Sequence, residues 1–176
     1  IKNFLRKKNI SFSQIENVSA VFFPVLYIND EIQSFNENFF YKSLNEIKIK
    51  NELINFILPL EDLDDFNKIQ EIKNRIRELN IDELINKYNT KNYVFTLMDY
   101  QNYQLNIYLK INFNNYMTSK NISYQIENIN NETRLNLILE ELKVKINDIW
   151  KEENIINTAM LLSLKIKFQH KNLKNL

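Results

Sequence analysis

The chain has 176 residues, a formal net charge of +1 at pH 7, and neither glycine nor cysteine. This length fits one domain with its own core, and the near-zero charge gives no electrostatic reason to expect a nucleic acid or an anionic membrane as partner. Without glycine there is no phosphate-binding loop and no dinucleotide fingerprint, and without cysteine there are no disulfides or thiolate metal sites.

Asparagine, isoleucine and lysine are abundant, which we interpret as a coding bias toward A/T-rich codons. Because glycine is absent, positions that need a positive φ must use Asn or Asp, the next most tolerant residues. The Asn-rich stretches 114–116 and 128–131 are therefore predicted turns.

The N-terminal part begins with residues 1–8, which have the pattern of a helix end, so we expect a fragment whose N-terminal part is missing. Residues 10–16 alternate weakly and indicate a short strand or a turn. The apolar run 18–28 predicts a strand buried on both faces. Proline cannot donate to a strand ladder, so we expect a bend near Pro24.

A strand–helix–strand unit follows. Residues 35–47 predict a helix with Asn36 or Asn38 as N-cap, and residues 53–60 predict a second buried strand. The sequence then predicts two helical stretches, 63–79 and 82–88, the second with Asp82 as cap. The apolar stripes of the two longer helices are Phe40, Leu44 and Ile47, and Ile69, Ile72 and Ile76.

From residue 93 the apolar period changes from 3.6 to 2. Residues 93–98 predict a buried strand, and 103–113 alternate so regularly that they predict an antiparallel strand with one buried face. Residues 122–127 indicate another strand. The buried face of the middle strand is predicted to comprise Tyr103, Leu105, Ile107, Leu109, Ile111 and Phe113.

The last elements are a long amphipathic helix at 132–150 and a strand at 159–168. The predicted order is β-α-β-α-α-β-β-β-α-β, which indicates a mixed α+β fold with helices packed on a mixed sheet of about six strands. We expect a single domain over 1–176, with a wound α/β half at 1–98 and an antiparallel meander plus the long helix at 99–176.

Four carboxylates lie together in residues 59–66, PLEDLDDF. They are Glu61, Asp62, Asp64 and Asp65, and oxygen ligands of this kind suit Mg²⁺ or Ca²⁺. Their spacing favours another interpretation, in which Pro59 ends a strand, Asp62 caps a helix, and the next acids lie in its positive first turn. We predict capping and keep the metal site as the alternative.

Aromatic residues gather at Phe35, Phe39, Phe40 and Tyr41 and cover nearly half a helix circumference. They can fill the core, or one or two of the rings can form an exposed patch that marks a partner surface. Tyr108, on the polar face of its strand, is a weaker candidate of the same kind.

The remaining polar clusters predict no chemistry. Glu140 and Glu141 are expected on a solvated helix face beside Lys143 and Lys145, with ion pairs of small value. The lysines of the tail 165–176 follow from coding bias, and the only histidine, His170, cannot by itself provide the two or three imidazoles of a zinc site.

The chain contains the segments 22–25 (FFPV), 36–44 (NENFFYKSL) and 57–69 (ILPLEDLDDFNKI), and a helix, Tyr, turn and strand unit at 84–97. Together these segments resemble an uncharacterised family of exported proteobacterial proteins. The likeness covers roughly residues 4–115. This chain has Glu37, Asn38 and Phe39 where members have Pro-Trp. The resemblance implies a bacterial, periplasmic or envelope-associated location and no assigned activity.

These observations lead to an expected function. We expect a non-enzymatic cell-envelope module that contacts an unidentified protein through an edge strand or the 35–41 aromatic patch, with no cofactor, no catalytic residue, no nucleic acid and no membrane-spanning segment. The alternative is a divalent-cation-dependent enzyme that uses the carboxylates of residues 61–65.

Overall fold

The computed structural model describes residues 17–71 and 73–154, and within these ranges the chain forms one mixed sheet of six strands with helices on both faces. The predicted mixed α+β fold class is confirmed. The strands are β1 (Val18–Ile28), β2 (Glu31–Ile32), β3 (Ile54–Ile57), β4 (Tyr93–Gln101), β5 (Gln104–Phe113) and β6 (Tyr116–Gln125). The helices are α2 (Phe39–Ser43), α3 (Leu63–Glu71), the 3₁₀ segment η1 (Lys73–Glu78), α4 (Ile81–Ile85) and α5 (Glu132–Asn154).

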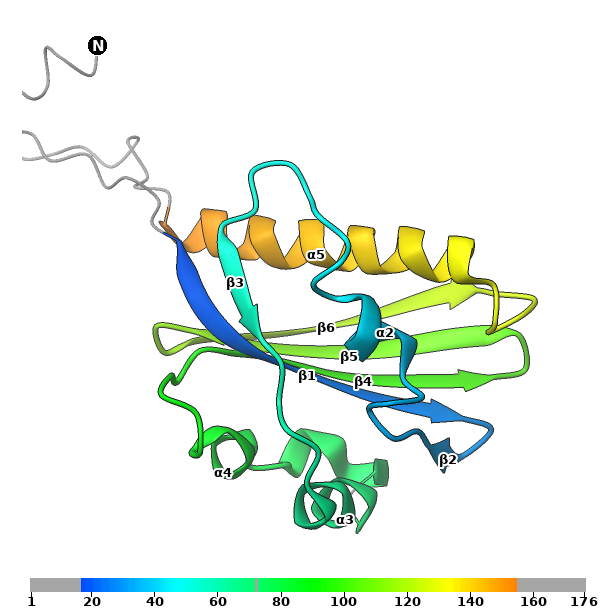
Figure 1. Ribbon diagram of the computed structural model, residues 1–176. Coiled ribbons are helices and arrows are strands. Elements are labelled where there is room, and N and C mark those ends of the chain that lie inside the picture. Colours follow the sequence, from blue (N-terminus) through cyan, green and yellow to red (C-terminus); the bar gives the residue numbers. More distant parts are fainter. Residues whose placement is uncertain (1–16, 72, 155–176) are drawn as a thin grey trace, which may run out of the picture. The chain divides into compact units, whose positions relative to one another are not determined.

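The sheet has a parallel part and an antiparallel part. β1 runs parallel to β3 and to β4, and β4, β5 and β6 form an antiparallel meander, so the order across the sheet is β2-β1-β4-β5-β6 with β3 beside the first half of β1. Helices α5 and α2 cover one face, and α3 and α4 lie on the other (Figure 1). β1 is therefore enclosed on both faces, as its continuous apolar sequence predicts.

Each face of the sheet carries its own hydrophobic core. The α5 side holds the alternate residues Phe22 and Leu26 of β1 with the apolar stripe of α5, and the opposite side holds Phe23 and Val25 with Ile69, Leu84 and Ile85. The buried stripe of α5 consists of Leu135, Ile138, Leu139, Leu142, Ile146, Ile149 and Trp150, the residues that the helical period predicts.

Pro24 lies in the middle of β1 without breaking it. The register with β4 is continuous through the pair Pro24–Thr96, so no bulge occurs there. The N–H of Val21 donates to the carbonyl of Asn92 on the β4 side. Because the direction of the backbone groups alternates along a strand, Pro24 directs its backbone away from β4, toward the side of β2 and β3. There β3 has ended and β2 has not begun. The Pro24 carbonyl accepts instead from Nδ2 of Asn38 at 3.1 Å, and the missing N–H interrupts no ladder.

Asn38 is also the predicted N-cap of α2. Its Oδ1 accepts from the N–H of Phe40 at 3.0 Å and from that of Tyr41 at 3.3 Å, while the side chain is fully buried. Of the two candidates, Asn36 and Asn38, the structure selects the second. The helix is shorter than predicted and ends at Ser43.

Other boundaries also differ from the sequence predictions, including those of β3, β4 and β6. α4 begins at Ile81 rather than at the predicted cap, Asp82, because the earlier start places Ile81 and the buried Leu84 and Ile85 on one face. The stretch 63–79 is interrupted, since Arg75 leaves helical geometry at φ −126° and ψ 33°. Tyr103 lies in the β4–β5 turn with a positive φ and is 66% exposed, so it is not part of the buried strand face.

Several predictions concern residues that the structure does not describe. These are the helix end at 1–8, the element at 10–16, the strand at 159–168, and the stripe residue Ile72. Within residues 17–71 and 73–154, no helix is both long enough and apolar enough to cross a membrane. The division into halves at residue 98 remains a prediction.

Candidate functional site

The outer edge of the sheet at β6 is the candidate functional site. Among the described residues, β6 pairs with β5 alone over ten residues. Its hairpin turns at Asn114 and Asn115, both with positive φ, and a two-residue turn of this kind makes Phe113 and Tyr116 a hydrogen-bonded pair. Since such pairs alternate along an antiparallel ladder, the even-numbered residues of β6 direct their backbone to β5.

The odd-numbered residues of β6 therefore direct their N–H and C=O groups away from the sheet. A backbone hydrogen bond just after β6 gives the same division into inward and outward residues. The N–H of Ile126, an even-numbered residue, donates toward the sheet, to the carbonyl of Tyr103 in the β4–β5 turn, at 2.8 Å. Outward backbone groups are the template to which another strand adds. They belong to Met117, Ser119, Asn121, Ser123 and Gln125.

The side chains around this edge are mostly polar and partly engaged, although Tyr116 and Met117 of β6 are exposed hydrophobic residues. Above β6, the Tyr124 hydroxyl donates to Glu141 of α5 at 3.0 Å, and burial together with that carboxylate raises the pKa of Tyr124 to about 12. Below it, the Ser123 hydroxyl donates to Asn106 at 2.6 Å. Lys120 is the only charged residue of β6, so the edge carries little of the charge that usually protects an edge strand.

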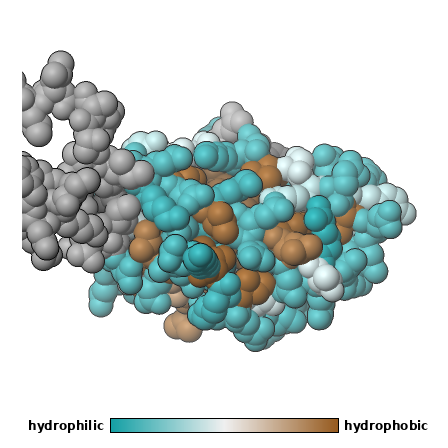
Figure 2. Space-filling view, turned by 90° about the horizontal axis from the view of Figure 1, so that it is seen from above, coloured by the Kyte–Doolittle hydropathy of each residue, from teal (hydrophilic) through white to brown (hydrophobic). Residues whose placement is uncertain are grey.

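The face covered by α5 offers no broad apolar surface. Figure 2 shows hydrophobic residues scattered among hydrophilic ones on this side. Leu137 and Val144 are half-exposed residues of α5. Isolated residues of this kind are normal on a soluble surface, so a contact that uses this region depends on polar and backbone groups.

Three of the four acids of residues 61–65 accept hydrogen bonds from other groups of the protein. Glu61 accepts from the N–H of Phe35 at 3.0 Å, whereas Asp62 and Asp65 accept from Lys87 at 2.7 and 2.6 Å. Within residues 17–71 and 73–154, no cluster of three or more His, Cys, Asp or Glu side chains could hold a metal ion.

The predicted helix cap at Asp62 is confirmed. Its Oδ1 accepts from the N–H of Asp64 at 3.0 Å at the start of α3. Hydrogen bonds from Lys87 and from this backbone N–H lower the pKa of Asp62. Burial opposes the charge of Lys87, but its bonds to Asp62 and Asp65 raise the pKa of the Lys87 ammonium above its ordinary value.

The aromatic residues at 35–41 pack inward. Phe35 is 2% exposed and Phe40 is fully buried, while Phe39 and Tyr41 are half-buried. Phe35 stacks on Tyr41 with ring centroids 4.4 Å apart, and the Tyr41 hydroxyl donates to the carbonyl of Pro59 at 2.8 Å. Core filling accounts for these positions, and the 35–41 aromatic residues form no broad exposed patch. Tyr108 is half-buried on the face opposite α5.

The polar residues of α5 divide into two groups. Glu140, Glu141 and Lys145 are exposed, as predicted. Lys143 is not, because its side chain is 1% exposed and its ammonium lies 2.6 Å from Glu52 and 3.1 Å from the carbonyl of Leu44. The sequence gives no signal for this, since a lysine close to Glu140, Glu141 and Lys145 has the pattern of a solvated face.

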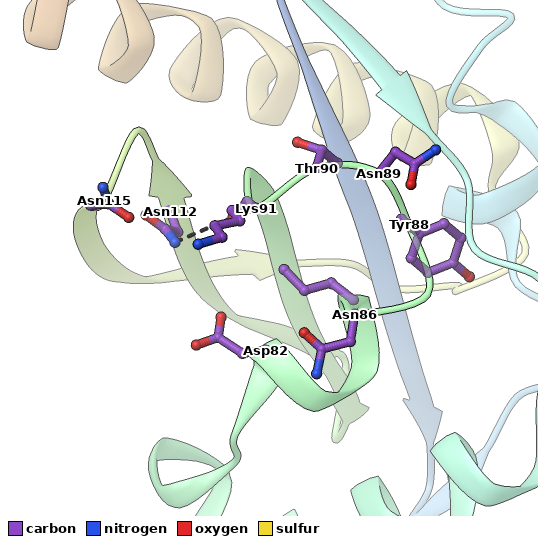
Figure 3. Close-up of a pocket in the computed structure, with 9 residues that line it drawn as sticks. Asp82, Asn86, Tyr88, Asn89, Thr90, Lys91, Asn112 and Asn115 are labelled. Carbon is purple, nitrogen blue, oxygen red and sulfur yellow. Dashed lines mark hydrogen bonds between the residues drawn. The ribbon is translucent and has the colours of Figure 1, made fainter.

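An open polar cleft of about 650 Å³ lies between α4 and the β5–β6 turn. Figure 3 shows Asp82 and Asn86 on the α4 side, across from Asn112 and Asn115. Asn112 is 7% exposed, and its Nδ2 donates to the carbonyl of Lys91 at 3.3 Å. Sequence reasoning does not find this cleft, because its walls come from segments about thirty residues apart.

No family model, curated protein or solved structure matches the chain. His170 and the lysines of 165–176 lie outside the described residues. The geometry of β6 is therefore the main basis for a functional conclusion.

Proposed function

We propose that this protein is a non-enzymatic interaction module that binds an extended segment of a partner protein by adding it as a strand to β6. The observation that carries the proposal is the outward-directed backbone of five residues along a ten-residue edge strand. In strand addition, main-chain hydrogen bonds supply affinity and the alternating side chains supply specificity.

The rest of the molecule favours this edge over the other candidates. The aromatic residues Phe35 and Phe40 are buried. Glu61, Asp62 and Asp65 accept hydrogen bonds from Lys87 and two backbone N–H groups. At the opposite side of the sheet, β2 and β3 have only two and four residues. β6 is thus the longest surface with backbone groups available for pairing in the described part of the chain.

The proposal includes a location in the bacterial cell envelope, and this part comes from the resemblance to the exported proteobacterial family. The coding sequence upstream of Ile1 tests it. A signal peptide there supports export. A complete upstream sequence without any export signal contradicts it.

Site-specific photo-crosslinking tests the interaction. A photoreactive phenylalanine analogue replaces Ser119 or Asn121 on β6, and, as a control, the exposed Asn136 on α5. In envelope extract we expect one defined crosslinked protein from the two β6 positions and none from Asn136.

The variant Ser123→Pro supplies the second control, because it removes an outward N–H and leaves the β5–β6 ladder intact. It should abolish the crosslink, while Ser123→Ala, which keeps the N–H, should retain it. Equal crosslinking from all positions, or crosslinking unaffected by the proline, would contradict strand addition.

A further inference from the structure

We infer that the strand added to β6 is β6 of a second copy of this chain, antiparallel about a two-fold axis at Asn121. This inference rests on the proposed function and names its partner. A two-fold contact uses the same surface on both copies, so the strand must be complementary to its own reverse.

The backbone permits such a pairing over the whole strand. Residues with outward backbone groups must form the hydrogen-bonded pairs of the new ladder, and they are the odd-numbered ones. With Asn121 opposite itself, Ser119 faces Ser123 and Met117 faces Gln125. All five outward residues are then paired, with about ten new hydrogen bonds at two per pair.

The side chains suit this register. The non-hydrogen-bonded pairs place Lys120 opposite Ile122 and Thr118 opposite Tyr124, which matches a β-branched residue with an aromatic one. On the other face, Asn121 lies opposite Asn121 of the second copy, and Ser119 lies opposite Ser123, whose hydroxyl donates to Asn106.

The neighbouring register centred on Lys120 is unfavourable. Centring the pair on Lys120 places the two ammonium groups directly opposite each other, in the pair type where side chains are closest. Like charges in that position destabilise a sheet. Lys120, the only charged residue of β6, thus excludes the register centred on itself. In the register centred on Asn121 it has no like charge opposite it.

Cysteine crosslinking tests the register, because the chain has no cysteine of its own. We expect Asn121→Cys to form a disulfide-linked dimer under mild oxidation, since directly opposite residues of a hydrogen-bonded pair have Cα atoms about 5.5 Å apart, within disulfide range. Ser119→Cys is the matched control on the same strand and face. Its two copies lie four residues apart along the ladder, about 14 Å and beyond disulfide range, so it should crosslink much more slowly. Mixing Ser119→Cys with Ser123→Cys should restore the fast reaction.

Sedimentation of the unmodified chain gives the second readout. We expect a mass twice that of the 21.3 kDa chain, and a single-chain mass for Asn121→Pro but not for Asn121→Thr. Equal disulfide rates for Asn121→Cys and Ser119→Cys, or a single-chain mass at 100 μM and about 0.15 M salt, would overturn the inference. If the protein is then still photo-crosslinked from Asn121 to another protein, the proposed function stands. If it is not, both fail.

Discussion

Buried polar side chains on α5 hold a loop that has little regular structure of its own. Lys143 reaches Glu52 and the carbonyls that follow α2, where a positive charge complements the end of the helix. One turn later, Asn147 accepts from the N–H of Leu53 at 2.9 Å and donates to the carbonyl of Asn51 at 3.0 Å. The two residues fix the segment that leads into β3.

Lys143→Met should lower the free energy of unfolding by about 3 kcal/mol, because it leaves Glu52 and two carbonyls without their donor. Urea denaturation followed by circular dichroism measures the change. The exposed Lys145→Met is the control and should change stability by less than about 0.5 kcal/mol. Equal effects would show that Lys143 is not buried as described.

The ion pair of Asp62 with Lys87 makes part of the folding stability depend on pH. The pKa of Asp62 is lowered in the folded state, so its contribution is present above the unfolded-state pKa and disappears as the pH falls through the folded-state pKa. Asp62→Asn keeps a good helix cap but loses the charge.

We therefore expect Asp62→Asn to have a lower urea midpoint than the unmodified chain at pH 7, and nearly the same midpoint at about pH 2. The exposed Asp64→Asn is the matched control and should show a smaller difference at pH 7. A pH-independent difference for Asp62→Asn would mean that its charge contributes nothing.

At the level of elements, the β5–β6 hairpin depends on asparagine where other chains use glycine. Asn114 and Asn115 have φ values of 51° and 69°, the conformation of a turn that favours Asn-Gly. Asn tolerates this region better than other residues with a Cβ atom, but less well than glycine.

Asn115→Gly should raise the free energy of unfolding by about 0.5–1 kcal/mol, and Asn115→Ala should lower it by about 1 kcal/mol. Thermal unfolding of the three proteins gives the order. A loss of stability on introducing glycine would contradict the positive φ at this position.

The elements that the sequence predicts well are those whose period is set by burial. β1, β5 and α5 each pack against a core, and their apolar spacing reveals them. The first half of β6, Tyr116 to Asn121, is not predicted as a strand. Its residues are mostly exposed on both faces, so apolar and polar residues do not alternate there. The candidate site therefore lies where burial leaves the weakest pattern, and only the register with β5 identifies its outward backbone groups.

For the molecule as a whole, the sheet separates two cores, and tyrosines with raised pKa values belong to both sides. Burial and the nearby Asp99 raise the pKa of Tyr27 to about 12, and burial with Asp82 and Tyr108 does the same for Tyr93. Tyr124, at the margin of the α5 side, also has a pKa of about 12. Folding therefore holds these three phenols in the protonated form.

Since their folded-state pKa values exceed the unfolded value of about 10, this stabilisation is complete below pH 10 and is lost as the pH rises toward 12. We expect the urea midpoint to fall over this interval. As the pH is raised, phenolate absorbance near 295 nm should increase in a late step that belongs to these tyrosines. In urea, where the chain is unfolded, the same step should occur at a lower pH. A single early titration of all nine tyrosines would contradict this environment.

The break beside Pro24 has a consequence for assembly. A fibre that grows by edge-to-edge pairing of sheets needs two free sheet edges on every molecule. In the described part of this chain, the sheet edge beyond β1 is divided into the short strands β2 and β3, with Asn38 between them, so the β6 edge alone is long and open. Pairing through a single edge stops at the dimer. It cannot continue into a fibre, even though the longest exposed strand is not covered by another element.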